Sequence, residues 1–163
     1  MEALEALRTR RSVRSFTDRA VDRADLETMV DCGRLAATAN NVQPWEFVVV
    51  TQRPTLERLS AVGKNAAMIA RAGACIAVVA RDTKYYLEDG SAATQNLLVA
   101  ARALGLGACW IAGDKKDYAD AVLKLLAVPA GHRLISLVAV GHPAEGPSPS
   151  KRPLGETLHW EKF

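Results

Sequence analysis

The sequence predicts a layered α+β domain in which helices cover both faces of one central sheet. Four short apolar runs are typical of buried strands, and helical patterns separate them along the chain. Of the 163 residues, 49% are hydrophobic and 24% are charged, which is the composition of a globular domain with a real core. No internal repeat or domain boundary is visible, so we expect a single domain over residues 1–163.

The first half of the chain alternates helix and strand patterns. Leu4 and Leu7 share one face of a short helix, and Asp22 is a plausible N-cap for a longer one with apolar residues at helical spacing. A loop precedes the first strand, whose continuous apolar run indicates burial on both faces. Pro54 then begins a helix, and a second short helix follows it. In order, these elements cover residues 2–9, 22–37, 39–44, 45–51, 54–62 and 64–71.

The second half continues with a buried strand and an alanine-rich and leucine-rich central helix. Gly105 and Gly107 end this helix before a third strand, and Asp114 is a candidate cap for the next helix before a fourth strand. These elements cover residues 75–80, 91–104, 108–112, 114–126 and 134–140. The tail, residues 142–163, is rich in proline, serine and charge. It has too little apolar content to fold alone, so we expect it to wrap a surface such as a partner subunit.

Charge and cysteine usage narrow the function classes. A net charge of +3 is only mildly basic, and no basic stripe interleaved with aromatic residues indicates nucleic-acid binding. Cys32, Cys75 and Cys109 lie far apart without a CxxC pair, which predicts reduced, buried thiols and neither a disulfide framework nor a zinc site. The acidic N-terminus does not resemble a signal peptide, and the apolar runs are too short to span a bilayer. We therefore expect a cytoplasmic protein without membrane or nucleic-acid partners.

The familiar catalytic motifs do not fit this chain. The pair Gly105 and Gly107 follows a helix and opens a strand, the reverse of a dinucleotide-binding fingerprint. His132, His142 and His159 are isolated, so surface or capping roles are favoured over metal binding. Neither a nucleotide-binding P-loop nor a GxSxG nucleophile elbow occurs. If the protein is an enzyme, a cofactor should therefore carry its chemistry.

Arginine residues gather around one hydroxyl group near the N-terminus. Arg10, Arg11 and Arg14 surround Ser12, and this set of donors suits the oxygens of a phosphate monoester. The alternative is a solvated helix end, where basic residues complement the helix dipole. Taken alone, these residues favour the helix-end interpretation.

Five segments, met in family order and covering nearly the whole chain, resemble the nitroreductase family. They are RRSVRSF at 10–16, NVQPWEF at 41–47, EDGSAATQNLL at 88–98, GLGACWI at 105–111 and GHP at 141–143. The resemblance implies the family's three-layer αβα fold, with a mixed central sheet and helices on both faces, and an intertwined homodimer. It also implies FMN as cofactor, bound at the dimer interface, with NADH or NADPH as co-substrate.

The first segment is the one that would hold the phosphate end of FMN. By resemblance, Arg10, Arg11 and Ser12 bind the phosphate, and Arg14 approaches the pyrimidine end of the flavin. A cation there favours the reduced flavin, which carries negative charge. Asn65 falls near the family's asparagine that bonds the polar edge of the ring, although a helix-terminus role is the alternative.

Two further segments are implied to enclose the flavin ring. From the other subunit come Ala37, Thr38, Ala39 and Asn41; many relatives have serines here, so backbone contacts would replace side-chain hydrogen bonds. The segment along the other face of the ring comprises Trp110, Ile111, Ala112 and Gly113. Its backbone N–H at Ala112 would point at flavin N5, so no side chain is predicted to be catalytic. A core role is the alternative for Trp110.

The last implied contacts come from the tail and from a short lid. Lys151 and Arg152 resemble the C-terminal basic pair that closes over the phosphate, although their spacing differs from the family's KxR form. Larger relatives carry a helical insertion over the active site, whereas only residues 81–90 fill that place here. Tyr85 and Tyr86 are the aromatic residues available to cover the flavin, so we expect an open pocket.

These features predict an oxidoreductase that passes hydride from NADH or NADPH through FMN to nitroaromatic, quinone or similar acceptors, with ping-pong kinetics. A non-catalytic dimer that binds or senses FMN is the alternative. A third interpretation, a small basic domain that binds nucleic acid through the arginine residues, ranks far behind both.

Overall fold

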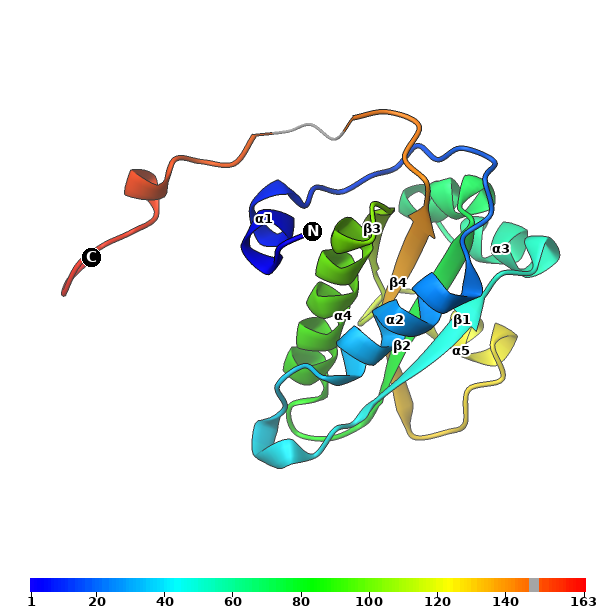
Figure 1. Cartoon of the computed structure of the whole chain (residues 1–163). Coiled ribbons are helices and arrows are strands. Elements are labelled where there is room, and N and C mark those ends of the chain that lie inside the picture. Colours follow the sequence, from blue (N-terminus) through cyan, green and yellow to red (C-terminus); the bar gives the residue numbers. More distant parts are fainter. Residues whose placement is uncertain (147–149) are drawn as a thin grey trace.

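A computed structural model of the chain describes residues 1–146 and 150–163 (Figure 1). Its helices and strands follow the predicted alternation. The α-helices are α1 (Ala3–Thr9), α2 (Arg23–Arg34), α3 (Arg53–Ser60), α4 (Tyr86–Ala103) and α5 (Ala119–Leu125). The strands are β1 (Trp45–Val50), β2 (Ala74–Arg81), β3 (Gly107–Ala112) and β4 (His132–Gly141). Short 3-10 helices are η1 (Ala39–Asn41), η2 (Lys64–Arg71) and η3 (Leu154–Glu156).

The four strands form one sheet in the order β1-β2-β4-β3, and all three strand pairs are antiparallel. The connections from β1 to β2 and from β3 to β4 each join two neighbouring antiparallel strands at the same end of the sheet. Within the described ranges, parallel pairing is limited to an isolated bridge between Ser12 and Ala108. The expectation of a mixed sheet is therefore met only by this one bridge.

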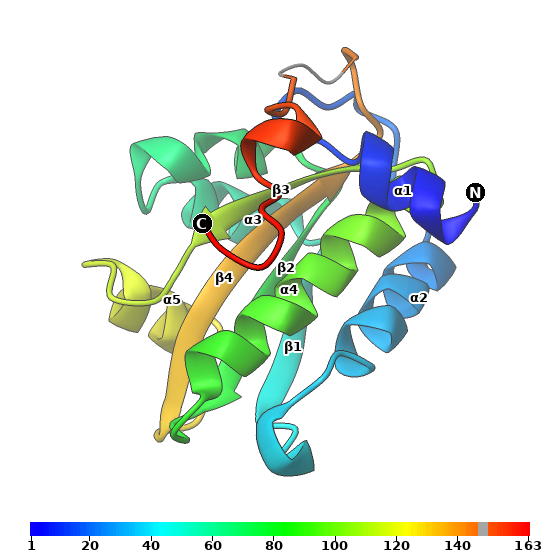
Figure 2. The same ribbon diagram turned by 90° about the vertical axis from the view of Figure 1, so that its left-hand side faces the viewer.

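Two hydrophobic clusters cover the two faces of the sheet. Figure 2 shows α2 and α4 side by side across one face, while α3, η2 and α5 cover the other. The first cluster includes Leu26, Met29 and Leu97 from α2 and α4, and the second includes Leu56, Leu59, Ile69 and Val122 from α3, η2 and α5. Helices on both faces of one sheet give three layers, which confirms the predicted fold class.

Strand β1 lies at the edge of the sheet and is only partly buried, so the expectation of burial on both faces is wrong. Trp45 and Val50 are buried at its two ends, but Glu46 is exposed and Val49 is 41% exposed. The strand pairs only with β2, and α2 covers it incompletely. A continuous apolar run cannot distinguish such an edge strand from a central one.

Helix α2 begins where predicted, but Asp22 caps it differently. Asp22 occupies the N-cap position and its side chain makes no capping hydrogen bond. Its backbone carbonyl accepts instead from the N–H groups of Asp25 and Leu26. The helix ends at Arg34, short of residue 37, and the chain turns into the following loop.

Helices α4 and α5 begin at different residues from those predicted. Helix α4 starts at Tyr86, five residues before the predicted residue 91, and so contains Gly90. A glycine is needed at this position because α4 packs closely on β4. A Cβ atom on Gly90 would lie 2.6 Å from Cγ1 of Ile135. Helix α5 starts only at Ala119, because the carboxylate of Asp114 accepts a hydrogen bond from the Tyr86 hydroxyl (2.9 Å) and caps no helix.

All three cysteines are free, as predicted, and we expect them to differ sharply in reactivity. Burial in the middle of the sheet raises the pKa of the Cys75 thiol to about 12, whereas Cys32 is partly exposed on α2. Because the thiolate is the reacting species, iodoacetamide at pH 8 should label Cys32 in the native protein and leave Cys75 unmodified. Mass spectrometry of tryptic peptides measures this, with unfolded protein as the control in which both are labelled. Equal native labelling of Cys32 and Cys75 would contradict it.

Candidate functional site

The arginine segment, residues 10–14, lies along the outer edge of β3. The Val13 N–H donates to the Ala108 carbonyl at 3.0 Å, and Ser12 forms its parallel bridge with the same residue. The close approach needs Gly107, since a Cβ atom there would lie 2.7 Å from Cγ1 of Val13. Two segments far apart in the sequence, RRSVRSF and GLGACWI, therefore meet at one end of β3.

Cationic and hydroxyl groups of the arginine segment gather around one residue of β3. Burial raises the pKa of the Cys109 thiol, while the nearby guanidinium groups of Arg14 and Arg10 and a hydrogen bond with Ser12 oppose this. The bridge between Ser12 and Ala108 sets the segment beside Cys109, and the influence of Arg10 and Arg14 on this thiol means that both cations are in its neighbourhood. Two cations and one hydroxyl form the donor set that a phosphate monoester requires.

Arg11 takes a different position. Its guanidinium donates to the carbonyl oxygens of Arg8 (2.9 Å) and Arg10 (2.8 Å), at the C-terminal end of α1. For this residue the structure shows the helix-end contact that was the alternative interpretation. From α4, Arg102 donates to the Thr9 hydroxyl (2.9 Å) and so ties the end of α1 beside the segment. Sequence reasoning missed this contact.

The predicted flavin-facing segment, residues 110–113, forms the end of β3. The Gly113 N–H donates to the Ile135 carbonyl of β4. In an antiparallel pair, successive backbone N–H groups point alternately toward the partner strand and away from it. The N–H groups of Trp110 and Ala112 therefore point away from β4. No strand in the described ranges pairs with this part of the edge. Ile111 instead points into the core and is buried. The Ala112 N–H is thus directed to the edge where a ligand could approach.

The remaining members of this end of the site differ in their surroundings. Gly113 is buried, and a Cβ atom there would lie 2.6 Å from Cγ of Leu134, so only glycine fits. The Tyr118 hydroxyl donates to the Ala112 carbonyl, and the same ring lies beside Gly63 at the start of η2. Asn65, two residues further, is exposed. The structure therefore brings the beginning of η2 close to the end of β3.

The Thr38 loop, residues 37–43, lies at the other end of the molecule. It contains the predicted residues Ala37, Thr38, Ala39 and Asn41. The Asp89 carboxylate in the first turn of α4 accepts the Ala39 N–H, whereas Arg102 at the last turn of α4 contacts the arginine segment's neighbour Thr9. At about 1.5 Å per residue, these two ends of α4 lie about 20 Å apart. Figures 1 and 2 both show the loop at the end of α4 away from α1.

The backbone of the Thr38 loop is conformationally costly. Asn40, Asn41 and Gln43 all have positive φ angles, of 52°, 54° and 48°. Asparagine tolerates the left-handed region better than most residues, whereas for Gln43 it costs about 1–2 kcal/mol, so surrounding contacts must hold this residue. The Thr38 hydroxyl accepts the Gln43 N–H (3.2 Å), and Arg81 donates to the carbonyl of Val42 (3.2 Å). These hydrogen bonds hold both ends of the loop in place.

The tail and the lid complete the predicted set. Lys151 and Arg152 are exposed, and every hydrogen bond and ring contact within residues 150–163 joins residues of that same stretch. One chain thus does not bring this basic pair to the arginine segment. In the lid, the Tyr86 hydroxyl is engaged by Asp114, so Tyr85, which is exposed, is the remaining aromatic residue able to cover a ligand.

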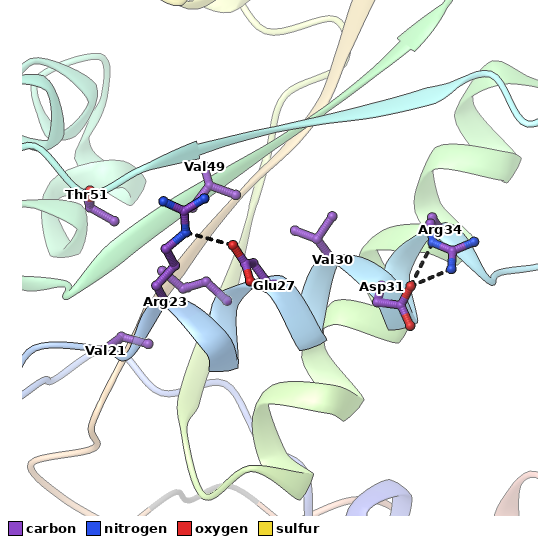
Figure 3. Close-up of a pocket in the computed structure, with 9 residues that line it drawn as sticks. Val21, Arg23, Glu27, Val30, Asp31, Arg34, Val49 and Thr51 are labelled. Carbon is purple, nitrogen blue, oxygen red and sulfur yellow. Dashed lines mark hydrogen bonds and ion pairs between the residues drawn. The ribbon is translucent and has the colours of Figure 1, made fainter.

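A separate hollow lies away from these residues. A groove of about 700 Å³ separates α2 from β1, and none of the predicted flavin contacts lines it (Figure 3). Two ion pairs on α2, Arg23 with Glu27 and Arg34 with Asp31, border it. In residues 1–146 and 150–163 no group of His, Cys, Asp and Glu could hold a metal ion, and no helix is long and apolar enough to cross a membrane.

Comparisons with known proteins show the family and the fold. The model of the nitroreductase family matches residues 7–72 and 58–142. A relative from Archaeoglobus fulgidus, named "Putative NADH dehydrogenase/NAD(P)H nitroreductase", is 36% identical over 88% of this chain and 87% of its own. The crystal structure of a protein of the same name from Bacteroides thetaiotaomicron superposes with a TM-score of 0.93 at 30% identity, covering 99% of this chain and 98% of that one. A "putative nitroreductase in complex with fmn" from Desulfovibrio desulfuricans superposes with a TM-score of 0.87 at 34% identity, covering 100% and 98%.

Proposed function

This chain belongs to the nitroreductase family, and we propose that, as a cytoplasmic homodimer, it reduces nitroaromatic, quinone or similar organic acceptors in ping-pong order. It is an FMN-dependent NAD(P)H oxidoreductase. The observation that carries the proposal is the meeting of the arginine segment with the open edge of β3. These are the two segments whose resemblance implies contact with the phosphate and the ring of FMN.

The described residues fit FMN at this edge. Arg10, Ser12 and Arg14 belong to the segment that pairs with Ala108 beside Cys109, and their positive charges and hydroxyl group suit the phosphate and the polar end of FMN. The Ala112 N–H points away from β4 toward the same edge. When bound, FMN supplies the two-electron chemistry, accepting hydride from the nicotinamide and passing it on.

The protein's own contribution is binding, orientation and electrostatics. Arg10 and Ser12 would bind the phosphate, with Arg11 adding positive charge from the end of α1. Arg14 would place a cation by the pyrimidine end, which stabilises negative charge there. The Ala112 N–H would donate a hydrogen bond to the ring edge, and Trp110 would flank it. Asn65, at the start of η2, would bond the polar edge from the Tyr118 side.

We infer that a second copy of the chain completes this site. The Thr38 loop lies about 20 Å along α4 from the arginine segment, so one chain does not present both to the same flavin ring. In a homodimer the loop of one subunit would line the flavin held by the other, with Ala37, Thr38, Ala39 and Asn41 at the contact. Lys151 and Arg152 would reach the phosphate from a tail that crosses to the partner.

The test of this function is the visible spectrum of the gently purified protein. We expect two flavin absorption bands that bleach within seconds when NADH or NADPH is added without air, because an open ring face admits the nicotinamide. Steady-state rates against a quinone should then give parallel double-reciprocal lines. Bands that persist would favour a non-catalytic FMN-binding dimer, and intersecting lines would exclude the ping-pong order. A colourless protein that takes up no added FMN would overturn the proposal.

A further inference from the structure

Asp89 is the one charged side chain that is buried within the described residues, with 4% of its surface exposed. It lies in the first turn of α4, where the positive end of the helix dipole favours a carboxylate. Its neighbour in the same turn, Glu88, is exposed. A buried carboxylate is costly unless both of its oxygens accept hydrogen bonds.

Those contacts are incomplete. Oδ1 of Asp89 accepts the backbone N–H of Ala39 at 2.9 Å, across fifty positions of sequence. Oδ2 is buried and has no hydrogen-bond partner among the described residues. A buried carboxylate with only one hydrogen-bonded oxygen adds little to the stability of the fold, because an apolar side chain of similar size would avoid the cost of desolvating it. Stability alone therefore does not explain why a carboxylate stands here.

What Asp89 does fix is the position of the Thr38 loop. Ala39 directly precedes the left-handed residues Asn40 and Asn41, and Arg81 holds the far end of the loop through the carbonyl oxygens of Val42 and Gln43. Arg81 is exposed, whereas Asp89 anchors the loop from the buried side. The single bond from Asp89 thus sets where the start of the loop lies against α4.

We propose that Asp89 is a positioning residue for FMN: it holds Ala39 so that the loop presents a preformed wall to the flavin of the partner subunit. The inference rests on the proposed function, which assigns this wall to the Thr38 loop. Because the loop has alanines where a hydroxyl could have bonded the flavin, its backbone must be in place before binding. A loop that became ordered only when FMN binds would lower the affinity, because the free energy of ordering it would be subtracted from the free energy of binding.

The test compares Asp89→Ala with Asp89→Asn, using Glu88→Ala as the matched control in the same turn. Asparagine can still accept the Ala39 N–H through its side-chain oxygen, and alanine cannot. We expect Asp89→Ala to raise the Kd for FMN about tenfold or more, Asp89→Asn to stay within about threefold, and Glu88→Ala to match the wild type. Titration of the apoprotein with FMN, followed by quenching of flavin fluorescence, measures this.

A second measurement on the apoprotein reports the loop itself. Exchange of the Ala39 amide proton, followed by NMR, should be faster in Asp89→Ala and near the wild-type rate in Asp89→Asn. The apoprotein melting temperature should change little in either variant. This pattern, with rescue by asparagine, is not expected of a residue that only stabilises the fold.

The outcomes separate this inference from the function on which it rests. If the wild type takes up no FMN, the proposed function fails and the inference fails with it. If the wild type binds FMN and Asp89→Ala binds it equally well, the inference is overturned and the function stands. Equal damage by alanine and asparagine, with a parallel fall in melting temperature, would likewise overturn the positioning role.

Discussion

Replacing Arg10 and Arg14 together by alanine is expected to abolish FMN binding at concentrations where the wild type is saturated. A hydrogen bond to a charged group contributes about 1.5–3 kcal/mol, so losing two such partners should weaken binding about a hundredfold to ten-thousandfold. The fold should survive, because Arg14 is exposed and Arg10 half-buried, and the buried core does not depend on either side chain. Calorimetric titration of the apoprotein with FMN measures the loss.

The control is Arg58→Ala, which removes an exposed arginine from α3, far from β3 in the sequence. This variant changes the net charge but should leave the affinity for FMN within about twofold. Raising the salt concentration should weaken the wild type more than the double variant, because the lost contacts are the charged ones. A double variant that binds FMN within threefold of the wild type would show that the cluster around Cys109 is not the phosphate site.

Much of the fold could be predicted from the sequence because its signals are local. Apolar runs located all four strands, and the helices were found to within a few residues. The errors arose where a distant contact overrides a local signal. The predicted central helix began at residue 91 and left out Gly90, yet Gly90 is the residue that lets α4 pack on Ile135. Asp114 looked like a helix cap, yet its carboxylate accepts from Tyr86.

In the candidate site, too, local features could be predicted from the sequence and distant contacts could not. Composition could single out the arginine segment, but only pairing across the fold brings Ser12 to Ala108 at the start of β3, the strand whose other end holds the predicted flavin contacts. The resemblance implied roles for these residues without explaining what holds them. Asp89 stood out only as part of the segment 88–98; its contact was not predicted, because its partner, Ala39, is remote in sequence and contributes only a backbone N–H. A backbone N–H leaves no side-chain pattern in the sequence from which this hydrogen bond could be predicted.

If the tail joins the subunits of the proposed homodimer, ending the chain after Glu145 is expected to give a monomer that no longer retains FMN. The described part of the removed stretch carries four exposed large apolar side chains, with Leu154 72% and Trp160 79% exposed, and its hydrogen bonds all stay within residues 150–163. Burying four large side chains against a partner would contribute about 6–12 kcal/mol before the costs of association. That range spans dimers from weak to tight, so the tail is large enough to decide assembly. Light scattering after size-exclusion chromatography measures the state of assembly.

The shortened chain should still fold, because both hydrophobic clusters lie entirely within residues 13–140. Its melting curve as a monomer is therefore the first control. Trp160→Ala with Phe163→Ala in the full chain should weaken the dimer in part, whereas Glu161→Ala with Lys162→Ala should leave it intact, since charged groups add little at an exposed tail. FMN retention should follow the fraction of dimer across this series, because only a partner brings the Thr38 loop to the arginine segment. A shortened chain that remains dimeric and yellow would show that the tail does not join the subunits, and that another surface places the two halves of the site together.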